Sequence, residues 1–444
     1  MDKVSLALQL ILSLSILVVL HEMGHYLPAK WFKTRVEKFY LFFDPYFSLF
    51  KKQIGDTEWG IGWVPFGGYV KISGMIDESM DKEQMKQPAQ PWEFRSKKAW
   101  QRLIIMIGGV TVNFILGILI FAGIIFYWGE SYIKSADAKF GIAVDSLGMD
   151  LGLQDGDRVI SAGGIAIDKF SSGLVAKEII INEAKEVVVE RDGKEVTLPV
   201  PADLSGKITK YDNKGKQLFY LRVPFGINVV DSTGTAYKSG ITKDMNIIAV
   251  NSNKIQYQHE LKKALQPLRN GIAKMVITTS PTDTIQKYVA VSHRGTIGIA
   301  MQPIDKFITP STEKFGLMTS VSKGSSRAVN FLGDQLKAFG QIFSGKMKAT
   351  ESLGSIFSMA SMFDPSWDWS IFWTMTASLS ILLAFFNLLP IPALDGGYVV
   401  FLIWEVITGK VPSDRFMEIV NYIGFILLMC LMVFALGLDI SRWF

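Results

Sequence analysis

The 444-residue sequence contains a single cysteine and only four histidines. Cys430 has no second cysteine to pair with, which excludes an internal disulfide and leaves the redox compartment undetermined. We interpret it as a small apolar packing residue. Histidine is also scarce, yet His21 and His25 lie within one pentapeptide. This concentration of half the histidines makes residues 21–25 the first candidate for a functional site.

Charge is absent from four long stretches of the chain. Apolar residues make up 49% of the sequence, and no charged residue occurs in Val4–Leu20, Ile104–Trp128, Trp369–Leu394 and Ile419–Leu438. Each stretch approaches or exceeds the roughly 20 residues that a helix needs to cross a bilayer core. We therefore predict four transmembrane helices. No small-x-small cleavage site follows the first stretch, so we expect it to be retained rather than removed as a signal peptide.

Basic residues cluster beside the first two predicted spans and indicate the topology. They are Lys30, Lys33, Arg35 and Lys38 after the first span, and Arg95, Lys97, Lys98 and Arg102 before the second. Each of these residues, taken singly, could be an ordinary solvated surface charge. The two clusters together follow the positive-inside rule and predict that residues 26–103 lie in the cytoplasm. The N-terminus, residues 129–368 and the C-terminus then lie outside. Topology explains the basic clusters, and nothing indicates nucleic-acid binding.

The external region 129–310 differs in composition from the predicted spans. It is rich in Gly, Asp and Lys, and its short Val/Ile-rich runs are bounded by turn residues, a pattern typical of strands. The predicted strands include Glu186–Arg191, Val196–Val200, Ile247–Asn251 and Lys274–Thr279, and Glu260–Leu268 is a predicted short helix. We therefore expect a soluble β-rich region with some helix.

This region also repeats internally. Residues 152–167 align with residues 240–255, and Phe-Gly-Ile precedes each copy. A repeat this long predicts two copies of one small domain, at 129–222 and 223–308. The pattern Gly-Leu-x-x-Gly-Asp in the first copy resembles PDZ domains. The second copy departs from it, because Asp244 and Met245 replace the second glycine and the aspartate.

A linker, 309–368, separates these domains from the third span. Within it Val329–Phe343 fits either an amphipathic helix on the membrane surface or a solvated helix. The remaining parts, 1–128 and 369–444, form the two membrane portions. The predicted fold class is an α-helical polytopic membrane protein, with four transmembrane helices and two inserted β-rich PDZ-like domains.

The chemistry centres on His21-Glu22-Met23-Gly24-His25 at the end of the first apolar stretch. Histidines at i and i+4 lie about 6 Å apart along one helical face, so both can bind one zinc ion. A catalytic zinc takes three protein ligands and leaves one position open, and Glu22 is a candidate general base. The alternative is a set of polar residues in a helical core. Because ionisable groups at membrane depth are costly, a functional role is favoured.

The third ligand must lie elsewhere, because no histidine or glutamate follows at metalloprotease spacing. Asp395 is the candidate. Pro390 and Pro392 end the preceding helix, and irregular backbone at membrane depth is tolerated only when it is buried in protein or lines a cavity. The predicted topology brings Asp395 and the His21 motif to the same cytoplasmic end. A turn or helix-capping aspartate remains the alternative.

The motifs His-Glu-x-Gly-His at 21–25 and Asn-x-x-Pro-x-Pro-x-Leu-Asp-Gly at 387–396 resemble the site-2 protease family of intramembrane zinc metalloproteases. The PDZ-like pair resembles its bacterial regulator-of-sigma-E protease branch. The resemblance implies one catalytic Zn2+ held by His21, His25 and Asp395, and Glu22 as the base. It further implies that Asn387 contacts the substrate backbone.

The resemblance also covers two glycine-rich stretches. Trp63–Gly74 is similar to the family's membrane re-entrant β-hairpin beside the active site, where Gly67, Gly68 and Tyr69 would meet an unwound substrate. Residues 108–113 are similar to the glycine-asparagine motif of the family's second span. The proline usual in that motif is replaced by Val110, which puts the local helix geometry in doubt.

The family implies cleavage within single-pass transmembrane proteins in the bacterial inner membrane. Such substrates are cut first on the outer side, as anti-sigma factors are, or are remnant signal peptides. The lipid bilayer is a further partner. The PDZ-like pair would either grip peptide C-termini or exclude bulky substrates. The rival interpretations are a non-catalytic scaffold presenting two PDZ modules, a transporter, and a soluble-type zinc protease with one anchor. The transporter interpretation predicts an inverted repeat, which we do not find in this sequence.

Overall fold

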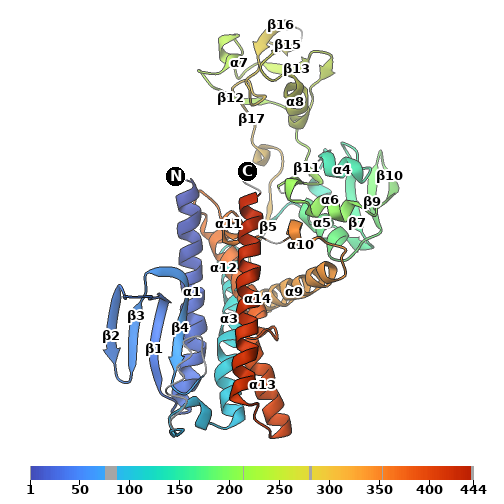
Figure 1. Ribbon diagram of the computed structural model, residues 1–444. Helices are drawn as coiled ribbons and strands as arrows, with labels where there is room; N and C mark the ends of the chain where they lie inside the picture. The colour runs from blue at the N-terminus through green and yellow to red at the C-terminus, as the bar shows by residue number, and fades with distance from the viewer. Residues whose placement is uncertain (1, 76–87, 214, 280–282, 353, 442–444) are drawn as a thin grey trace. The chain divides into compact units, whose positions relative to one another are not determined.

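The computed structural model describes residues 2–75, 88–213, 215–279, 283–352 and 354–441 (Figure 1). They form two compact units, of which the first comprises residues 1–129, 314–339 and 353–444 and the second residues 130–313 and 340–352. The first unit carries the long apolar helices and the second carries the two β-rich modules. Each unit has hydrophobic clusters of its own.

Four helices of the first unit are long and apolar enough to cross a membrane. They are α1 (Asp2–Trp31), α3 (Ala99–Tyr127), α12 (Trp369–Leu388) and α14 (Asp414–Ser441) (Figure 1). This confirms the four predicted spans. Helix α12 begins where Asp368 caps it by accepting a hydrogen bond from the Ile371 N–H at 2.9 Å. Most of α14 is exposed, and Cys430 on it is exposed rather than packed, contrary to the interpretation from sequence.

A further helix, α13 (Asp395–Thr408), follows α12 and was not predicted from the sequence. Its 14 residues are apolar enough to be read as a continuation of a membrane segment, but they are too few to cross a bilayer. Gly409 ends it in the left-handed conformation with φ of 70°. Helices α1, α12 and α13 all pack against α3, which is therefore the centre of the bundle. Helices α1 and α3 approach closely at Gly24 and Gly108, where a Cβ on Gly24 would lie 2.5 Å from the Gly108 carbonyl oxygen.

Between α1 and α3 the chain forms a four-stranded sheet. Its strands are β1 (Val36–Phe43), β2 (Phe50–Ile54), β3 (Thr57–Ile61) and β4 (Val64–Ile72), in the order β2-β3-β1-β4. The expectation that Trp63–Gly74 forms a hairpin by itself is wrong. Residues 64–72 are a single strand that pairs antiparallel with β1, because 36–43 supply a long aromatic and β-branched partner.

The second unit contains two successive modules. The first comprises β6 (Ile142–Val144), α4 (Ser146–Asp150), β7 (Arg158–Ala162), β8 (Ile165–Ala166), α5 (Ser172–Ile180), β9 (Glu186–Arg191), β10 (Lys194–Pro199), α6 (Leu204–Thr209) and β11 (Phe219–Leu221). The second comprises β12 (Ile227–Val230), α7 (Thr235–Lys238), β13 (Asn246–Val250), β14 (Asn253–Lys254), α8 (Gln258–Leu265), β15 (Ile272–Thr278), β16 (Thr284–Ala290) and β17 (Ile299–Met301). Strands β5 (Glu130–Tyr132) and β18 (Ser311–Glu313) pair beside them. The strands foreseen at 186–191, 196–200, 247–251 and 274–279 are present to within two residues as β9, β10, β13 and β15.

The two modules have the same order of strands, although helix α6 of the first has no counterpart among the described residues of the second. In the first the four-stranded sheet runs β10-β9-β7-β8, and in the second it runs β14-β13-β15-β16, so each strand has its counterpart. Each module also pairs its first strand with its last, β6 with β11 and β12 with β17. The predicted helix Glu260–Leu268 corresponds to α8 and the 3-10 turn Gln266–Leu268 that follows it.

Helix α9 (Leu317–Phe343) spans the boundary of the two units. It contains the expected helix 329–343 and extends it by about three turns toward the N-terminus. The short helices α10 (Ala349–Ser352) and α11 (Ile356–Ala360) follow it. Whether α9 lies on a membrane surface or in solvent stays a prediction.

Candidate active site

Both motif histidines lie on α1, which continues without a break to Trp31. Since they are one helical turn apart, their side chains share one face of the helix. Both residues are 7% exposed, and their Nε2 atoms lie 3.2 Å apart. The imidazole rings meet edge to face, with 4.9 Å between centroids. The i, i+4 prediction for His21 and His25 is therefore confirmed as geometry.

Asp395 is the first residue of α13, at the end of a tight loop. Helix α12 stops at Leu388, before Pro390 and Pro392, whose rings remove two backbone donors. The chain turns through Ala393, a non-glycine residue with φ of 71°. The first turn of α13 then folds back so closely that a Cβ on Gly396 would lie 2.1 Å from the Leu389 carbonyl oxygen. The glycine after the aspartate is thus required for the loop to present Asp395.

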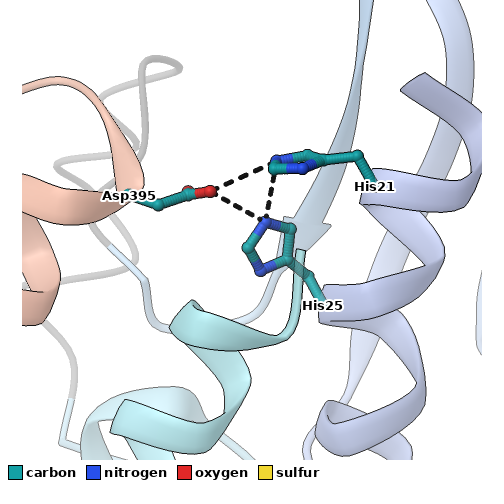
Figure 2. Close-up of side chains that lie close together, drawn as sticks. All are labelled: His21, His25 and Asp395. Carbon is teal, nitrogen blue, oxygen red and sulfur yellow. Dashed lines mark hydrogen bonds and ion pairs between the residues drawn. The ribbon is translucent and has the colours of Figure 1, made fainter. Parts of the chain in front are cut away.

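The Asp395 carboxylate points at the two imidazoles (Figure 2). Its Oδ2 lies 3.2 Å from the Nε2 of His21 and 3.3 Å from the Nε2 of His25. Within the part of the chain that the structure describes, this is the one group of three His, Cys, Asp or Glu residues that could hold a metal ion. The structure therefore brings together the three candidate ligands that the sequence indicated from two distant motifs.

The three donor atoms, 3.2–3.3 Å apart, have separations close to those around a zinc ion. Tetrahedral zinc with bonds of about 2.0–2.2 Å places its ligand atoms about 3.3–3.6 Å apart. The tautomer agrees, because the Nδ1 of His25 lies 2.8 Å from the Ile105 carbonyl oxygen and so carries the proton. In a neutral ring this leaves the lone pair on Nε2, facing a carboxylate oxygen. A cation between these electron-rich atoms removes the repulsion, so the residues present fit zinc.

A cavity of about 600 Å³ opens beside these three residues, and Glu22 lines it with them. Glu22 is partly buried, and Val70 of β4 lines the same cavity. Strand β4 packs against α1. This placement agrees with the predicted role of Glu22, since a general base must lie at the site where the substrate binds.

Helix α3 supplies a second set of contacts, which the sequence did not reveal. A Cβ on Gly109 would lie 2.4 Å from the Nε2 of His25 and 2.7 Å from the Cε1 of His21. Only glycine leaves room there for both rings. The side-chain amide of Asn113 lies 3.1 Å from the Nδ1 of His21. The sequence signal was the glycine-asparagine spacing, which identified a motif without indicating what it touches.

The predicted substrate-binding residues lie at different distances from the donor cluster. Asn387 is nearest, with its side-chain amide nitrogen 3.4 Å from the Nε2 of His21. Gly68 and Tyr69 line the cavity, and the Tyr69 hydroxyl donates to Asp44 at 2.9 Å. Gly67 has φ of 103° and lies against the Phe43 ring. It is not among the residues that line the cavity.

Helix α14 forms a cavity wall that the sequence did not predict. Asn421, Tyr422 and Phe425 line the cavity, and the Asn421 amide donates to the Tyr398 hydroxyl at 2.9 Å. The available signal was a pair of polar residues at the start of an otherwise apolar run. It is weak, because such residues are also usual at the ends of membrane helices.

Two histidines and an aspartate converging beside a partly buried glutamate, on a bundle of membrane-length helices, define a membrane metallohydrolase. Comparison with known proteins gives the family: residues 9–431 match Peptidase family M50, and the chain belongs to it. It is 26% identical over 443 residues to a protein of Rickettsia conorii and 27% identical over 469 residues to one of Neisseria meningitidis. It is also 24% identical over 460 residues to a protein of Treponema pallidum. Each alignment covers at least 97% of both chains, and all three proteins carry the name "Putative zinc metalloprotease".

The family assignment agrees with the resemblance stated from the two sequence motifs. The protein is an intramembrane zinc metalloprotease of family M50, and Zn2+ is its cofactor. This decides between the rival interpretations in favour of the enzyme over the scaffold and the transporter.

Proposed function

We propose that this protease hydrolyses peptide bonds inside the transmembrane segments of single-pass proteins that have already been cut on their outer side. The observation that carries the proposal is the convergence of His21, His25 and Asp395 within 3.3 Å, beside a cavity walled by membrane-length helices. An enzyme that acts on soluble substrates would not need its catalytic groups at the depth of a bilayer. Anti-sigma-factor-like proteins and remnant signal peptides are substrates of the expected kind.

In this proposal His21, His25 and Asp395 hold one zinc ion. When bound, zinc supplies Lewis-acid activation of a water molecule and of the scissile carbonyl. The Glu22 carboxylate accepts the proton of the attacking water and passes it to the leaving amine nitrogen. The Glu22 carboxylate shares its cavity with Val70 of β4 and with the three proposed ligands.

The substrate helix must unwind before a peptide carbonyl can reach the site, because helical carbonyls are occupied by hydrogen bonds. Strand β4 offers replacements for them. Among the described residues it pairs only with β1, at one edge of the sheet. An extended substrate would add as a further strand along the side of β4 that does not pair with β1, near Gly68 and Tyr69. Asn387, beside His21, would then hold the substrate backbone at the cleavage point.

The two β-rich modules would act outside the membrane as a PDZ-like pair. Their shared order of strands supports two copies of one domain. They either hold the new C-terminus of a trimmed substrate or exclude substrates that are still bulky. The basic clusters near residues 30–38 and 95–102 support an orientation in which the N- and C-termini and both modules face the periplasm. The active site then lies toward the cytoplasmic face of a bacterial inner membrane.

The test is cleavage of a reporter with one transmembrane segment, by purified wild type and by Glu22→Gln, with zinc measured in both. We expect wild type to cleave within the segment, Glu22→Gln to lose at least about a hundredfold in rate, and both to hold one zinc per chain. Cleavage outside the segment would contradict the proposed substrate site. Equal activity of the two proteins would contradict the role of Glu22.

A further inference from the structure

One face of α3 follows the catalytic face of α1. Ile105, Gly109 and Asn113 are spaced by four residues, so they lie along one side of the helix. The Ile105 carbonyl oxygen is 2.8 Å from the Nδ1 of His25, and Gly109 leaves room for both rings. Asn113 reaches the Nδ1 of the other histidine, His21, at 3.1 Å. The two proposed zinc ligands are therefore each contacted on the ring nitrogen that faces away from Asp395.

The two Nδ1 contacts differ in chemistry. At His25 the partner is a carbonyl, which can only accept, so the ring proton is on Nδ1. If His21 also binds zinc through Nε2, its Nδ1 carries a proton as well and needs an acceptor. The Asn113 amide has one acceptor atom, Oδ1, which is buried and has no hydrogen-bond partner within the described residues. A half turn of the amide group exchanges its oxygen and nitrogen with little change in packing.

We propose that Asn113 is a positioning residue for the zinc site: its side-chain oxygen accepts a hydrogen bond from the Nδ1–H of His21. This bond fixes the His21 tautomer, leaves the Nε2 lone pair for the metal and makes the ring a stronger ligand. The inference rests on the proposed assignment of His21 as a ligand.

The surroundings of Asn113 hold it where this role requires. Asn113 is fully buried, at 0% exposed, and its backbone carbonyl accepts a hydrogen bond from the Ser380 hydroxyl of α12 at 2.7 Å. Ser380 is fully buried too. The backbone at Asn113 is thus tied to α12, and its side chain extends to α1. The Ser380 contact provides a matched control, because it touches the same residue without touching His21.

The test is the zinc dissociation constant of the full-length protein in detergent, measured by competition with a chromogenic chelator. Loss of a hydrogen-bond partner of a ligand histidine weakens zinc binding about 10- to 100-fold. We expect that loss for Asn113→Leu, which offers no acceptor. Asn113→Asp keeps an acceptor oxygen, and we expect its zinc affinity to stay within about threefold of wild type. Ser380→Ala should also bind zinc as wild type does.

Cobalt-substituted protein gives a second readout, since its visible absorption reports the ligand geometry. We expect the spectrum to change in Asn113→Leu and to be retained in Asn113→Asp and Ser380→Ala. Wild-type zinc affinity in Asn113→Leu, or equal losses in the Leu and Asp variants, would overturn the proposed acceptor role. Asp395→Ala separates the two levels of the argument. If that variant retains zinc, the proposed metal site itself is wrong, whatever Asn113 does.

Discussion

A Cβ atom on Gly109 would lie 2.4 Å from the Nε2 of His25, closer than atoms that are not bonded can approach. The two residues belong to α3 and α1, whose backbones are in contact one helical position away, at Gly24 and Gly108. Because these helices approach so closely, His21 and His25 pack against a stretch of α3 backbone at Gly108 and Gly109, where there is no side chain. The metal site therefore depends on a glycine that contributes no ligand atom.

Gly109→Ala should weaken zinc binding at least about tenfold, because the methyl group displaces the His25 ring from its position beside Asp395. Zinc content after dialysis against a weak chelator measures the effect. Gly123→Ala is the matched control on the same helix, since a Cβ there meets no atom within 4 Å. Equal zinc retention by the two variants would show that α3 adjusts to the methyl group.

Zinc removal should lower the thermal stability of the first unit, because in the proposed site the metal would link Asp395 of α13 to the histidines of α1. A ligand present at a thousand times its dissociation constant stabilises the native state by about 4 kcal/mol. We expect a strong chelator to lower the melting temperature of the wild type. Asp395→Ala should melt at that lower temperature with or without chelator. A chelator effect that persists in this variant would place the stabilising metal elsewhere.

Asn387→Ala should separate substrate binding from metal binding. Its amide nitrogen lies 3.4 Å from the Nε2 of His21, at the limit of a hydrogen bond, so the loss should leave zinc content unchanged. If the amide holds the substrate backbone in the transition state, kcat/KM should fall about a hundredfold. Reporter kinetics and zinc analysis on the same preparation provide the check. Loss of zinc would instead make Asn387 part of the metal site.

Asp157→Ala should destabilise the first external module by about 3–5 kcal/mol. Asp157 is 1% exposed, and its two carboxylate oxygens accept hydrogen bonds from Arg191 at 2.8 and 2.7 Å. Removing the carboxylate leaves the partly buried guanidinium without its charged partner, although it still donates to the Gly152 carbonyl oxygen at 3.0 Å. Hydrogen exchange in β7 and β9 of the full-length protein, followed by mass spectrometry, measures the change.

The second module suggests the matched control. Met245 and Thr279 occupy the positions that correspond to Asp157 and Arg191. The double variant Asp157→Met/Arg191→Thr should therefore be more stable than Asp157→Ala, because replacing a whole buried pair is less costly than breaking it. If the double variant exchanges faster than the single one, the modules differ more in their packing than their shared order of strands indicates.

The motif residues and the membrane spans were predictable because their signals are local. Seventeen charge-free residues before His21 predict a helix whatever surrounds it, and the i, i+4 spacing then puts His21 and His25 on one face. Strands such as Glu186–Arg191 were also predictable, from β-branched runs between turns. The expectation of a hairpin within Trp63–Gly74 was wrong, because residues 64–72 form one strand that pairs with β1. In the sequence, β2 and β3 lie between these two partners. Pairing between distant segments leaves no local pattern.

The sequence by itself singled out the candidate catalytic side chains: His21, Glu22, His25 and Asp395 are proposed from spacing, from the cost of charge in a membrane and from helix-breaking prolines. Only the tertiary structure decided how they are held. It placed Asp395 3.2 Å from His21, brought β4 to the cavity that Glu22 lines, and turned Ile105, Gly109 and Asn113 toward the histidines. The physical reason is that these contacts depend on the packing of α1, α3 and α13. Packing is a property of pairs of surfaces, which no single stretch of sequence contains.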